Sequence, residues 1–238
     1  MRDLYESDLN GNRQSRKLRA SEFFSELGAA ALKDFDALKC VVMFPGGAVL
    51  FHEQQKTHGV FVLCAGEVKF SISSSAGKAL ILRIAKVGDI LGLAATLSGS
   101  PYEATAQTVN PCQLAFLRGD AFLRFVATHP EAYRGVVTQL SRLYSEACDQ
   151  LRIVGLSASP SEKLARLLLD RSSEMKNAKQ ATSIVPSLTH NEIAECIGTS
   201  RESVTRALSD FKRRKLVVLE GSTLTISNRP ALEAIGCR

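Results

Sequence analysis

The chain has 238 residues, 45% of them hydrophobic, and its 30 lysines and arginines against 24 acidic residues give a net charge of +6. This length and apolar content allow two domains with buried cores, and no apolar run approaches the roughly 20 residues that span a bilayer. The first 20 residues are polar and unlike a secretory signal. We therefore expect a cytoplasmic protein that has no membrane partner.

The six cysteines stand at positions 40, 64, 112, 148, 196 and 237, and no two are closer than 24 residues. No C-x-x-C pair is present, so we expect free thiols in a reducing compartment and no structural zinc or other metal site. Cys64 and Cys112 each lie in an apolar run, where a buried small hydrophobic side chain is the simplest interpretation.

In the N-terminal half, the residue types and the spacing of apolar side chains change along the chain. Residues 1–20 have the mixed charges and Asn, Gly and Ser content of a loose polar arm, and residues 21–38 space their apolar side chains at helical intervals. From Cys40 to about Leu117, short runs rich in β-branched and aromatic residues alternate with glycine-containing turns. This spacing predicts an antiparallel β-sandwich or small barrel, and we take residues 21–129 as one domain.

A long helix is predicted from Glu131 to about Leu156, after a shorter helix that Pro130 stops. Its narrow apolar stripe recurs close to every 3.5 residues, which suits a two-helix seam better than general core burial. We therefore expect residues 130–158 to form a homodimer helix and hinge, although packing on the chain's own barrel would also bury such a stripe. The expected interface residues are Val136, Leu140, Leu143, Ala147, Leu151 and Val154.

A second domain, residues 159–238, begins at 159–162 with an N-cap serine, a proline at the first helical position and a capping-box glutamate. Further on, the segments 189–192 and 199–202 repeat the S/T-x-x-E capping pattern, and Gly198 separates them. Two short helices joined by a glycine-containing turn are the signature of a helix-turn-helix.

The second of these helices has two distinct faces. At about 100° per residue, its apolar side chains fall on one side and must face the core; they are Val204, Ala207, Leu208 and Phe211. The opposite stripe is polar, with Thr205 beside it and Arg201 at its edge; it consists of Glu202, Arg206, Ser209 and Arg213. The simplest alternative is a solvated helix face with a Glu202–Arg206 ion pair.

The surroundings of this stripe favour a DNA-binding surface. Residues 201–215 hold six cations and two carboxylates, so most of the net positive charge of the chain could lie there, as expected for a protein that binds the phosphate backbone. A predicted β-hairpin follows, with its turn at residues 220–222. Two capped helices, a basic run and a hairpin together indicate a winged helix-turn-helix.

The segment LTHNEIAECIGTSRESVTRALSDFKRRKLV, residues 188–217, closely resembles the DNA-binding segment of the CRP/FNR superfamily, and the barrel, dimer helix and hinge before it match that family over about residues 21–230. The resemblance implies an α+β fold: an N-terminal antiparallel β-roll of the double-stranded jelly-roll type, a long dimerisation helix and a C-terminal winged helix-turn-helix domain. It also implies a bacterial transcription factor rather than an enzyme. Such a protein binds a palindromic operator in double-stranded DNA as a homodimer and acts with RNA polymerase.

By this resemblance, Arg201, Glu202 and Arg206 match the positions that contact base edges. Arginine can donate two hydrogen bonds to guanine, and glutamate can accept one from cytosine. The residues expected to contact the DNA backbone are Thr189, Asn191, Ser200, Ser203, Thr205 and Arg213.

The N-terminal half resembles the cyclic-nucleotide-binding β-roll of the family but departs from it at the ligand. Members that bind cyclic AMP carry a ribose-binding glutamate and an Arg-Ser pair, where this chain has Leu93 and the pair Tyr102–Glu103. A carboxylate there would repel a cyclic phosphate, so cyclic AMP is not expected and the effector, if one exists, is unknown. We expect a different ligand or signal at the junction of β-roll and dimer helix, lined by Leu93, Tyr102, Glu103, Thr105, Tyr144 and Cys148.

The sequence also bears on three alternatives: an iron–sulfur cluster, a redox-active thiol and a metal enzyme. The oxygen-sensing members of the family carry a cysteine cluster ahead of the barrel, and residues 1–39 contain no cysteine, so an iron–sulfur cluster is not expected. Cys148 on the predicted dimer helix leaves a thiol-based redox regulator, with a disulfide between two copies, as an alternative. His52, Glu53 and His58 leave a cupin-like metal enzyme as a more distant one, although their spacing differs from the His-x-His motif.

Overall fold

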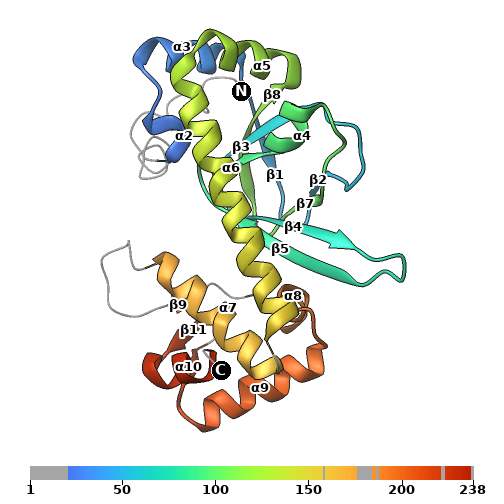
Figure 1. Cartoon of the computed structure of the whole chain (residues 1–238), viewed down its shortest axis with the longest axis vertical. Coiled ribbons are helices and arrows are strands. Elements are labelled where there is room, and N and C mark those ends of the chain that lie inside the picture. Colours follow the sequence, from blue (N-terminus) through green and yellow to red (C-terminus); the bar gives the residue numbers. More distant parts are fainter. Residues whose placement is uncertain (1–20, 158, 176–183, 186–187, 221–222, 237–238) are drawn as a thin grey trace. The chain divides into compact units, whose positions relative to one another are not determined.

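A computed structural model of the chain describes residues 21–157, 159–175, 184–185, 188–220 and 223–236 (Figure 1). The chain divides into two compact units, one made of residues 1–72 and 82–146, the other of residues 73–81 and 147–238. The predicted polar arm, residues 176–183 and 186–187, and Cys237 lie outside the described residues. The four-segment division expected from the sequence stays a prediction.

The first unit is built on two four-stranded sheets, with the strand orders β1-β8-β3-β6 and β2-β7-β4-β5. The pairs β1–β8, β3–β8, β3–β6, β2–β7 and β4–β7 are antiparallel, which confirms the predicted β-roll. The strands are β1 (Cys40–Phe44), β2 (Val49–Phe51), β3 (Gly59–Ala65), β4 (Val68–Ser73), β5 (Ala79–Ala85), β6 (Ile90–Leu91), β7 (Thr105–Thr108) and β8 (Cys112–Arg118).

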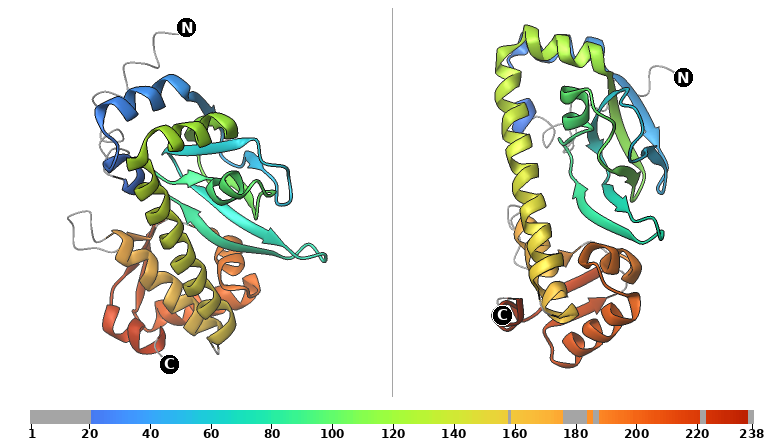
Figure 2. Two further views of the ribbon diagram at one scale, coloured as in Figure 1. Left: turned by 45° about the horizontal axis from the view of Figure 1, so that its top comes forward. Right: turned by 45° about the vertical axis from the view of Figure 1, so that its right-hand side comes forward.

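Helices cover one face of the β1-β8-β3-β6 sheet (Figure 2). They are α2 (Glu22–Ser25), α3 (Ala29–Leu38), α5 (Gly119–Thr128) and the N-terminal part of α6 (Pro130–Leu151), while the short α4 (Leu93–Ser98) was not predicted. Strand β3 is buried on both faces because its side chains alternate: Val60 and Val62 join the cluster beneath the helices, and Leu63 joins the cluster between the sheets.

Polar contacts fix α6 against the edge strand β6. Gln139 is 2% exposed; its side-chain oxygen accepts the backbone N–H of Ile90 at 3.1 Å and its amide donates to the Ile90 carbonyl at 2.8 Å. One turn further, Arg142 donates to the buried carboxylate of Asp89 at 2.6 Å, which Arg83 also contacts at 2.8 Å. Since an unpaired buried backbone group costs about 1–3 kcal/mol, this face of α6 is held in one register.

The burial of α6 changes the predicted dimer interface. Val136 is 3% exposed and lies in the core of its own chain, so it is not available to a second copy. Instead Tyr133, Val137, Tyr144 and Leu151 are 52–73% exposed. With the half-buried Leu140 and the exposed Ala147, they recur at alternating spacings of four and three residues, the heptad spacing of a two-helix seam.

The second unit contains the C-terminal elements and the tip of the β4–β5 hairpin. After α6 come a π-helical turn η1 (Arg152–Leu156), α7 (Pro160–Met175), β9 (Ile184–Val185), α8 (His190–Ile197), α9 (Arg201–Arg213), β10 (Val217–Glu220), β11 (Thr223–Ile226) and α10 (Arg229–Gly236). The predicted long helix thus ends in a π turn, and the predicted N-cap at Ser159 is confirmed by its bond from the Glu162 N–H at 3.2 Å.

The last helix, α10, was not predicted. It packs on α7, where Arg166 donates to the Gly236 carbonyl at 2.5 Å and Arg229 donates to the Ser172 hydroxyl at 2.8 Å. Leu232 of α10 is fully buried. None of the helices in the described part of the chain is long and apolar enough to cross a membrane.

Candidate nucleic-acid interface

The first helix of the predicted helix-turn-helix, α8, begins with the expected capping box. The Thr189 hydroxyl accepts the backbone N–H of Glu192 at 3.2 Å, and the Glu192 carboxylate accepts the backbone N–H of Thr189 at 3.0 Å. Gly198 ends the helix in the left-handed conformation, with φ of 63°, which glycine adopts without strain. The buried side chains Ile193 and Ile197 fix this helix to the core of the unit.

The second helix, α9, begins one residue later than its capping pattern predicted. Its N-cap is Ser200, whose hydroxyl accepts the Ser203 N–H at 3.2 Å, so the predicted capping box between Thr199 and Glu202 is wrong. The predicted core face is confirmed: Val204, Ala207, Leu208 and Phe211 are buried. A helix with a buried face of this kind must expose the opposite one.

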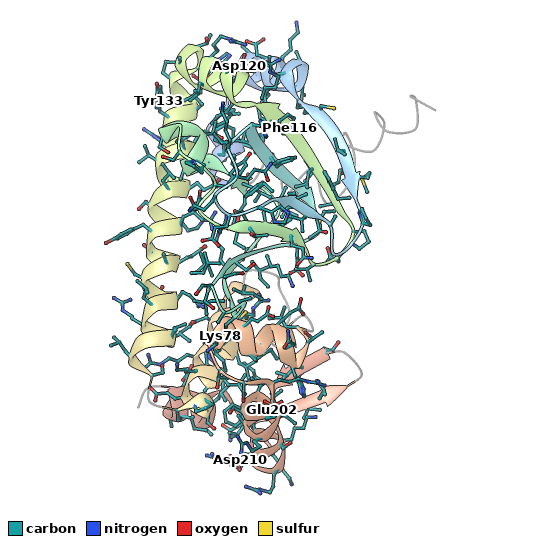
Figure 3. The ribbon with its side chains drawn as sticks, turned by 90° about the vertical axis from the view of Figure 1, so that its right-hand side faces the viewer. Lys78, Phe116, Asp120, Tyr133, Glu202 and Asp210 are labelled. Atoms are coloured by element: carbon teal, nitrogen blue, oxygen red, sulfur yellow. The ribbon has the colours of Figure 1, made fainter. Side chains whose placement is uncertain are left out.

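The exposed face of α9 is the predicted polar stripe. Its exposed members are Arg201, Glu202, Thr205, Arg206, Ser209 and Arg213. Figure 3 labels one of its members, Glu202. No salt bridge between Glu202 and Arg206 is present; the Arg206 guanidinium instead contacts the Ser203 hydroxyl at 3.4 Å. Both charged groups therefore remain available at the surface near the start of the helix.

The environment of Glu202 keeps its carboxylate ionised. Its pKa is lowered because its own backbone N–H and the Ser200 hydroxyl donate to it at the N-terminus of α9, with smaller contributions from the positive charges of Arg201 and Arg206. An ionised carboxylate accepts hydrogen bonds and donates none. At this position it can select a base that offers an amino group, such as cytosine.

Basic side chains are concentrated at the C-terminal end of α9. Asp210 is paired with Arg213 and Arg214, which leaves Lys212 and Lys215 as further positive charges at the same end. The backbone of Lys215 is left-handed, with φ of 57°, and it turns the chain from α9 into β10. Cations close to a helix end that approaches DNA raise affinity without sequence preference.

A contact between the two helices was missed by sequence reasoning. The His190 ring nitrogen Nδ1 lies 3.0 Å from the Thr205 hydroxyl, which itself donates to the Arg201 carbonyl at 3.0 Å. Because a hydroxyl has one hydrogen, Nδ1–H of His190 donates to Thr205 in this arrangement. His190 and Thr205 are 15 positions apart, and no local sequence pattern could have indicated this bond.

Four of the residues expected to contact the DNA backbone lie at the starts of α8 and α9. Thr189 is the N-cap of α8, and Asn191 is exposed in its first turn, where it donates to Glu195 at 2.8 Å. Ser200 is the N-cap of α9, and the backbone N–H of Ser203 donates to its hydroxyl. Their contact with phosphate stays a prediction.

The predicted wing is present as an antiparallel hairpin. Strand β10 pairs with β11 from Val217–Ile226 to Glu220–Thr223, and β9 adds a third strand on the other side of β11. The two residues of its turn, 221–222, lie outside the described part of the chain. The fold of a winged helix-turn-helix is therefore confirmed.

In the β-roll, Tyr102 occupies the position where the resemblance expects a phosphate-binding arginine. It is 1% exposed, and its ring stacks on Phe51 with centroids 3.8 Å apart. Its hydroxyl donates to the Gly59 carbonyl at 2.9 Å and accepts the His58 N–H at 3.3 Å. A β-carbon on Gly92 would lie 2.6 Å from this ring, so the left-handed glycine and the tyrosine fit each other.

The remaining residues of the expected effector pocket differ in their burial and in the part of the fold where they lie. Leu93 is buried beneath the helices, in a different apolar cluster from Tyr102. Glu103 is exposed, and the Thr105 hydroxyl accepts the Glu53 N–H at 3.0 Å. Tyr144 is exposed on α6, and Cys148 is half-buried in the second unit. Their role in binding an effector stays a prediction.

Two of the buried cysteines are poor nucleophiles. Burial raises the pKa of the Cys64 thiol to about 11, and burial also raises the pKa of Cys112, whose sulfur lies 3.2 Å from the Glu67 carbonyl. Both thiols are protonated at neutral pH. Across the described residues, no three His, Cys, Asp or Glu side chains are grouped so that they could hold a metal ion.

Comparison with known proteins supports both halves of the fold. Residues 162–235 match the family of Crp-like helix-turn-helix domains, and residues 41–129 match the cyclic nucleotide-binding domain. The chain is similar to the CRP-like cAMP-activated global transcriptional regulator of Mycobacterium tuberculosis, with 27% identity over 80% of this chain and 85% of that protein.

A second relative and a solved structure also match most of the chain. The nitrogen fixation regulation protein FixK of Bradyrhizobium diazoefficiens is 26% identical over 92% of this chain and 91% of that protein. The structure of FixK2 from Bradyrhizobium japonicum matches with a TM-score of 0.73 over 83% of this chain and 96% of that chain, at 17% identity.

Proposed function

Because the chain belongs to the CRP/FNR family of transcriptional regulators, we propose that it binds a palindromic operator as a homodimer and regulates transcription there through RNA polymerase. Each α9 enters a major groove, and the two grooves lie about 34 Å apart on one face of the DNA. Such a regulator works in the bacterial cytoplasm, where the chromosome lies.

The exposed stripe of α9 is the observation that carries this proposal. Arg201, Glu202 and Arg206 present guanidinium and carboxylate groups beside the helix N-terminus, and the opposite face of the helix is buried. Arginine matches guanine O6 and N7, and the ionised Glu202 matches the cytosine amino group. The hydroxyl groups of the two N-caps and the cations at the end of α9 suit the phosphates on either side.

The operator can be found by selecting duplexes from a randomised palindromic library with the full-length protein. We expect enrichment of one two-fold symmetric sequence, bound about 10³-fold or more tightly than a scrambled duplex of equal length. Equal affinity for the two duplexes would contradict the proposal.

The exposed apolar residues of α6 support a homodimer. Tyr133, Val137, Tyr144 and Leu151 form a solvent-exposed stripe along one side of a 22-residue helix. When a second copy of the helix covers large apolar side chains at heptad spacing, their burial stabilises the dimer. A two-fold pair of these helices also matches the symmetry of a palindromic operator.

The signal that controls the protein acts, in this proposal, at the junction of the β-roll and α6 and is not cyclic AMP. Tyr102 is supported by two hydrogen bonds and a stacked ring, and an exposed carboxylate, Glu103, follows it. Binding a cyclic phosphate here would require displacing Tyr102 from these contacts and placing an anion beside Glu103.

Addition of 1 mM cyclic AMP is therefore expected to change the Tm of the protein by less than about 1 °C. A ligand present at 100 times its Kd stabilises a protein by about 2.7 kcal/mol, which raises Tm by several degrees at this chain length. Differential scanning fluorimetry makes the comparison, with the cAMP-activated regulator of Mycobacterium tuberculosis as the positive control. A shift of several degrees that saturates with concentration would contradict the prediction.

A thiol-based response is disfavoured by the buried cysteines. Iodoacetamide at pH 8 is expected to alkylate the exposed Cys40 and to leave the buried Cys64 and Cys112 unmodified. With a pKa of about 11, the Cys64 thiol is about 0.1% ionised at that pH, and burial raises the pKa of Cys112 as well. Peptide mass spectrometry before and after unfolding in urea measures the difference. Rapid labelling of Cys64 in the folded protein would overturn this expectation, and an oxidised dimer linked through Cys148 would restore the redox alternative.

A further inference from the structure

The hydroxyl hydrogens along the exposed stripe of α9 are already used within the protein. Thr205 donates to the Arg201 carbonyl at 3.0 Å, and Ser209 donates to the Thr205 carbonyl at 2.8 Å. A hydroxyl has one hydrogen, and the phosphate oxygens of DNA accept hydrogen bonds rather than donate them. Thr205, which the sequence predicts as a contact to the DNA backbone, therefore has no hydrogen left to donate to a phosphate.

The imidazole of His190, on the neighbouring helix α8, is oriented by this same hydroxyl. Its Nδ1–H donates to Thr205 at 3.0 Å, because the hydrogen of Thr205 is bonded to the Arg201 carbonyl. His190 is half-buried, and across the described ranges no protein group bonds its other ring nitrogen, Nε2. The bond to Thr205 therefore leaves Nε2 as the nitrogen that can meet a ligand.

The charge of the ring decides what Nε2 can bind. In the neutral ring with its hydrogen on Nδ1, Nε2 is an acceptor, and an acceptor cannot bond a phosphate oxygen. In the imidazolium both nitrogens carry a hydrogen, so protonation adds a charged donor at Nε2 and keeps the bond to Thr205. Protonated His190 can therefore supply the phosphate contact that Thr205 cannot.

His190 is the only histidine in the second unit, since the others are at positions 52, 58 and 129. The charged groups nearest to it in the two helices are the carboxylates of Glu192 and Glu195 on α8 and the Arg201 and Glu202 side chains at the start of α9. Carboxylates and guanidinium groups do not ordinarily titrate between pH 6 and 8, and histidine does. The third helix packed here, α7, has apolar buried side chains, among them Leu164, Ala165, Leu167 and Leu168.

We propose that protonated His190 donates through Nε2 to a phosphate of the operator, so that DNA binding takes up protons and strengthens as the pH falls from 8 to 6. The proposal rests on the proposed DNA binding and adds a residue to its backbone contacts. The sign follows from linkage: the phosphate favours the charged ring, so the bound protein keeps the proton to a higher pH than the free protein does. The gain in affinity is therefore present at pH 6 and is lost as the pH rises to 8.

Fluorescence-anisotropy titration of the full-length protein at pH 6 and pH 8, at one salt concentration, measures this effect. We expect the wild type to bind the selected operator about 10- to 100-fold more tightly at pH 6, because each of two protomers gains a charge-assisted hydrogen bond. His190→Asn keeps an amide donor for Thr205 but has no group that titrates, and its affinity is expected to differ by less than about threefold between the two pH values. Wild-type pH dependence in this variant would overturn the proposal, as would a wild type without pH dependence.

His129→Asn is the matched control. The His129 ring also contacts a neighbouring helix, with Nε2 lying 3.0 Å from Asp34 Oδ2, but it belongs to the first unit. The same substitution there is expected to keep the full pH dependence of operator binding. If it removed the pH dependence to the same extent as His190→Asn, the proton uptake would not belong to a contact of His190 with DNA.

The salt dependence of binding distinguishes a phosphate contact from a purely structural role. The logarithm of the affinity falls with the logarithm of the salt concentration by about 0.9 for each phosphate that a cation neutralises. We expect the wild-type slope to be steeper at pH 6 than at pH 8, by up to about 0.9 per protomer, for the scrambled duplex as well as for the operator. His190→Asn is expected to show one slope at both pH values, and a wild-type slope that does not change with pH would overturn the phosphate contact.

Nitrogen-15 NMR of the histidine rings gives a readout that needs no DNA. At pH 8, His190 is expected to carry its hydrogen on Nδ1, and Thr205→Val is expected to move it to Nε2, because the acceptor that selects the tautomer is gone. A wild-type ring with its hydrogen on Nε2 would overturn the proposal. Failure to select any operator would instead contradict the proposed function, whereas a selected operator bound equally at pH 6 and pH 8 would contradict the His190 contact alone.

Discussion

Replacing Arg206 by alanine is expected to abolish discrimination between the operator and scrambled DNA while leaving the dimer intact. Arg206 is exposed on α9, so its removal creates no cavity in the core. A bidentate arginine–guanine contact contributes about 1–3 kcal/mol of discrimination, and a homodimer makes it twice, so the preference falls by about 30-fold to 10⁴-fold. Fluorescence-anisotropy titration of the two duplexes measures the loss.

Arg213→Ala is the matched control for this experiment. Arg213 is also exposed on α9 but pairs with Asp210 at the C-terminal end of the stripe. Its removal is expected to weaken both duplexes alike and to lower the salt dependence by about one phosphate contact per protomer. If Arg206→Ala kept wild-type operator affinity, the assignment of α9 as the base-contacting helix would be wrong.

Replacing Tyr144 by glutamate is expected to convert the dimer into a monomer and to lower operator affinity by 10²-fold or more. Tyr144 is 73% exposed at the middle of the apolar stripe of α6, and a two-fold axis would bring the two new carboxylates close together in an apolar seam. The affinity falls because two linked recognition helices gain about 10²- to 10⁴-fold from their effective concentration. Sedimentation velocity measures the mass, and the anisotropy titration measures the affinity.

Ser145→Glu introduces the same charge at the adjacent exposed residue, on a different side of α6. It is expected to keep the mass and the affinity of the wild type. A dimeric Tyr144→Glu variant would place the interface elsewhere, and a monomeric wild type at micromolar concentration would contradict the homodimer.

Local patterns in the sequence were sufficient to predict the winged helix-turn-helix and the two faces of its second helix. The 100° periodicity identified both faces of α9, because its apolar residues all pack into a single core and its charged residues lie on the opposite, exposed side. The start of the helix was misplaced by one residue since Thr199 and Ser200 are both good N-caps, and the choice depends on which N–H groups each hydroxyl reaches.

Contacts distant in the chain explain what sequence reasoning missed. Val136 and Val137 are adjacent apolar residues that fit two different heptad phases, and the choice between them depends on which side of α6 the β-roll covers. Tyr102 could be matched to a ligand position, but its bond to Gly59 spans 43 residues. His190 resembles any polar residue at the start of a helix until Thr205 of the next helix is brought to it.

A footprint of the full-length protein on its selected operator tests the central claim most directly. Methylation interference at guanine N7 detects contacts in the major groove, which is where α9 is proposed to bind. We expect two clusters of interference related by a two-fold axis and about one helical turn apart, with Arg206→Ala losing the dependence on the central guanine of each cluster. A single cluster, or binding insensitive to guanine methylation, would contradict a pair of α9 helices in successive major grooves.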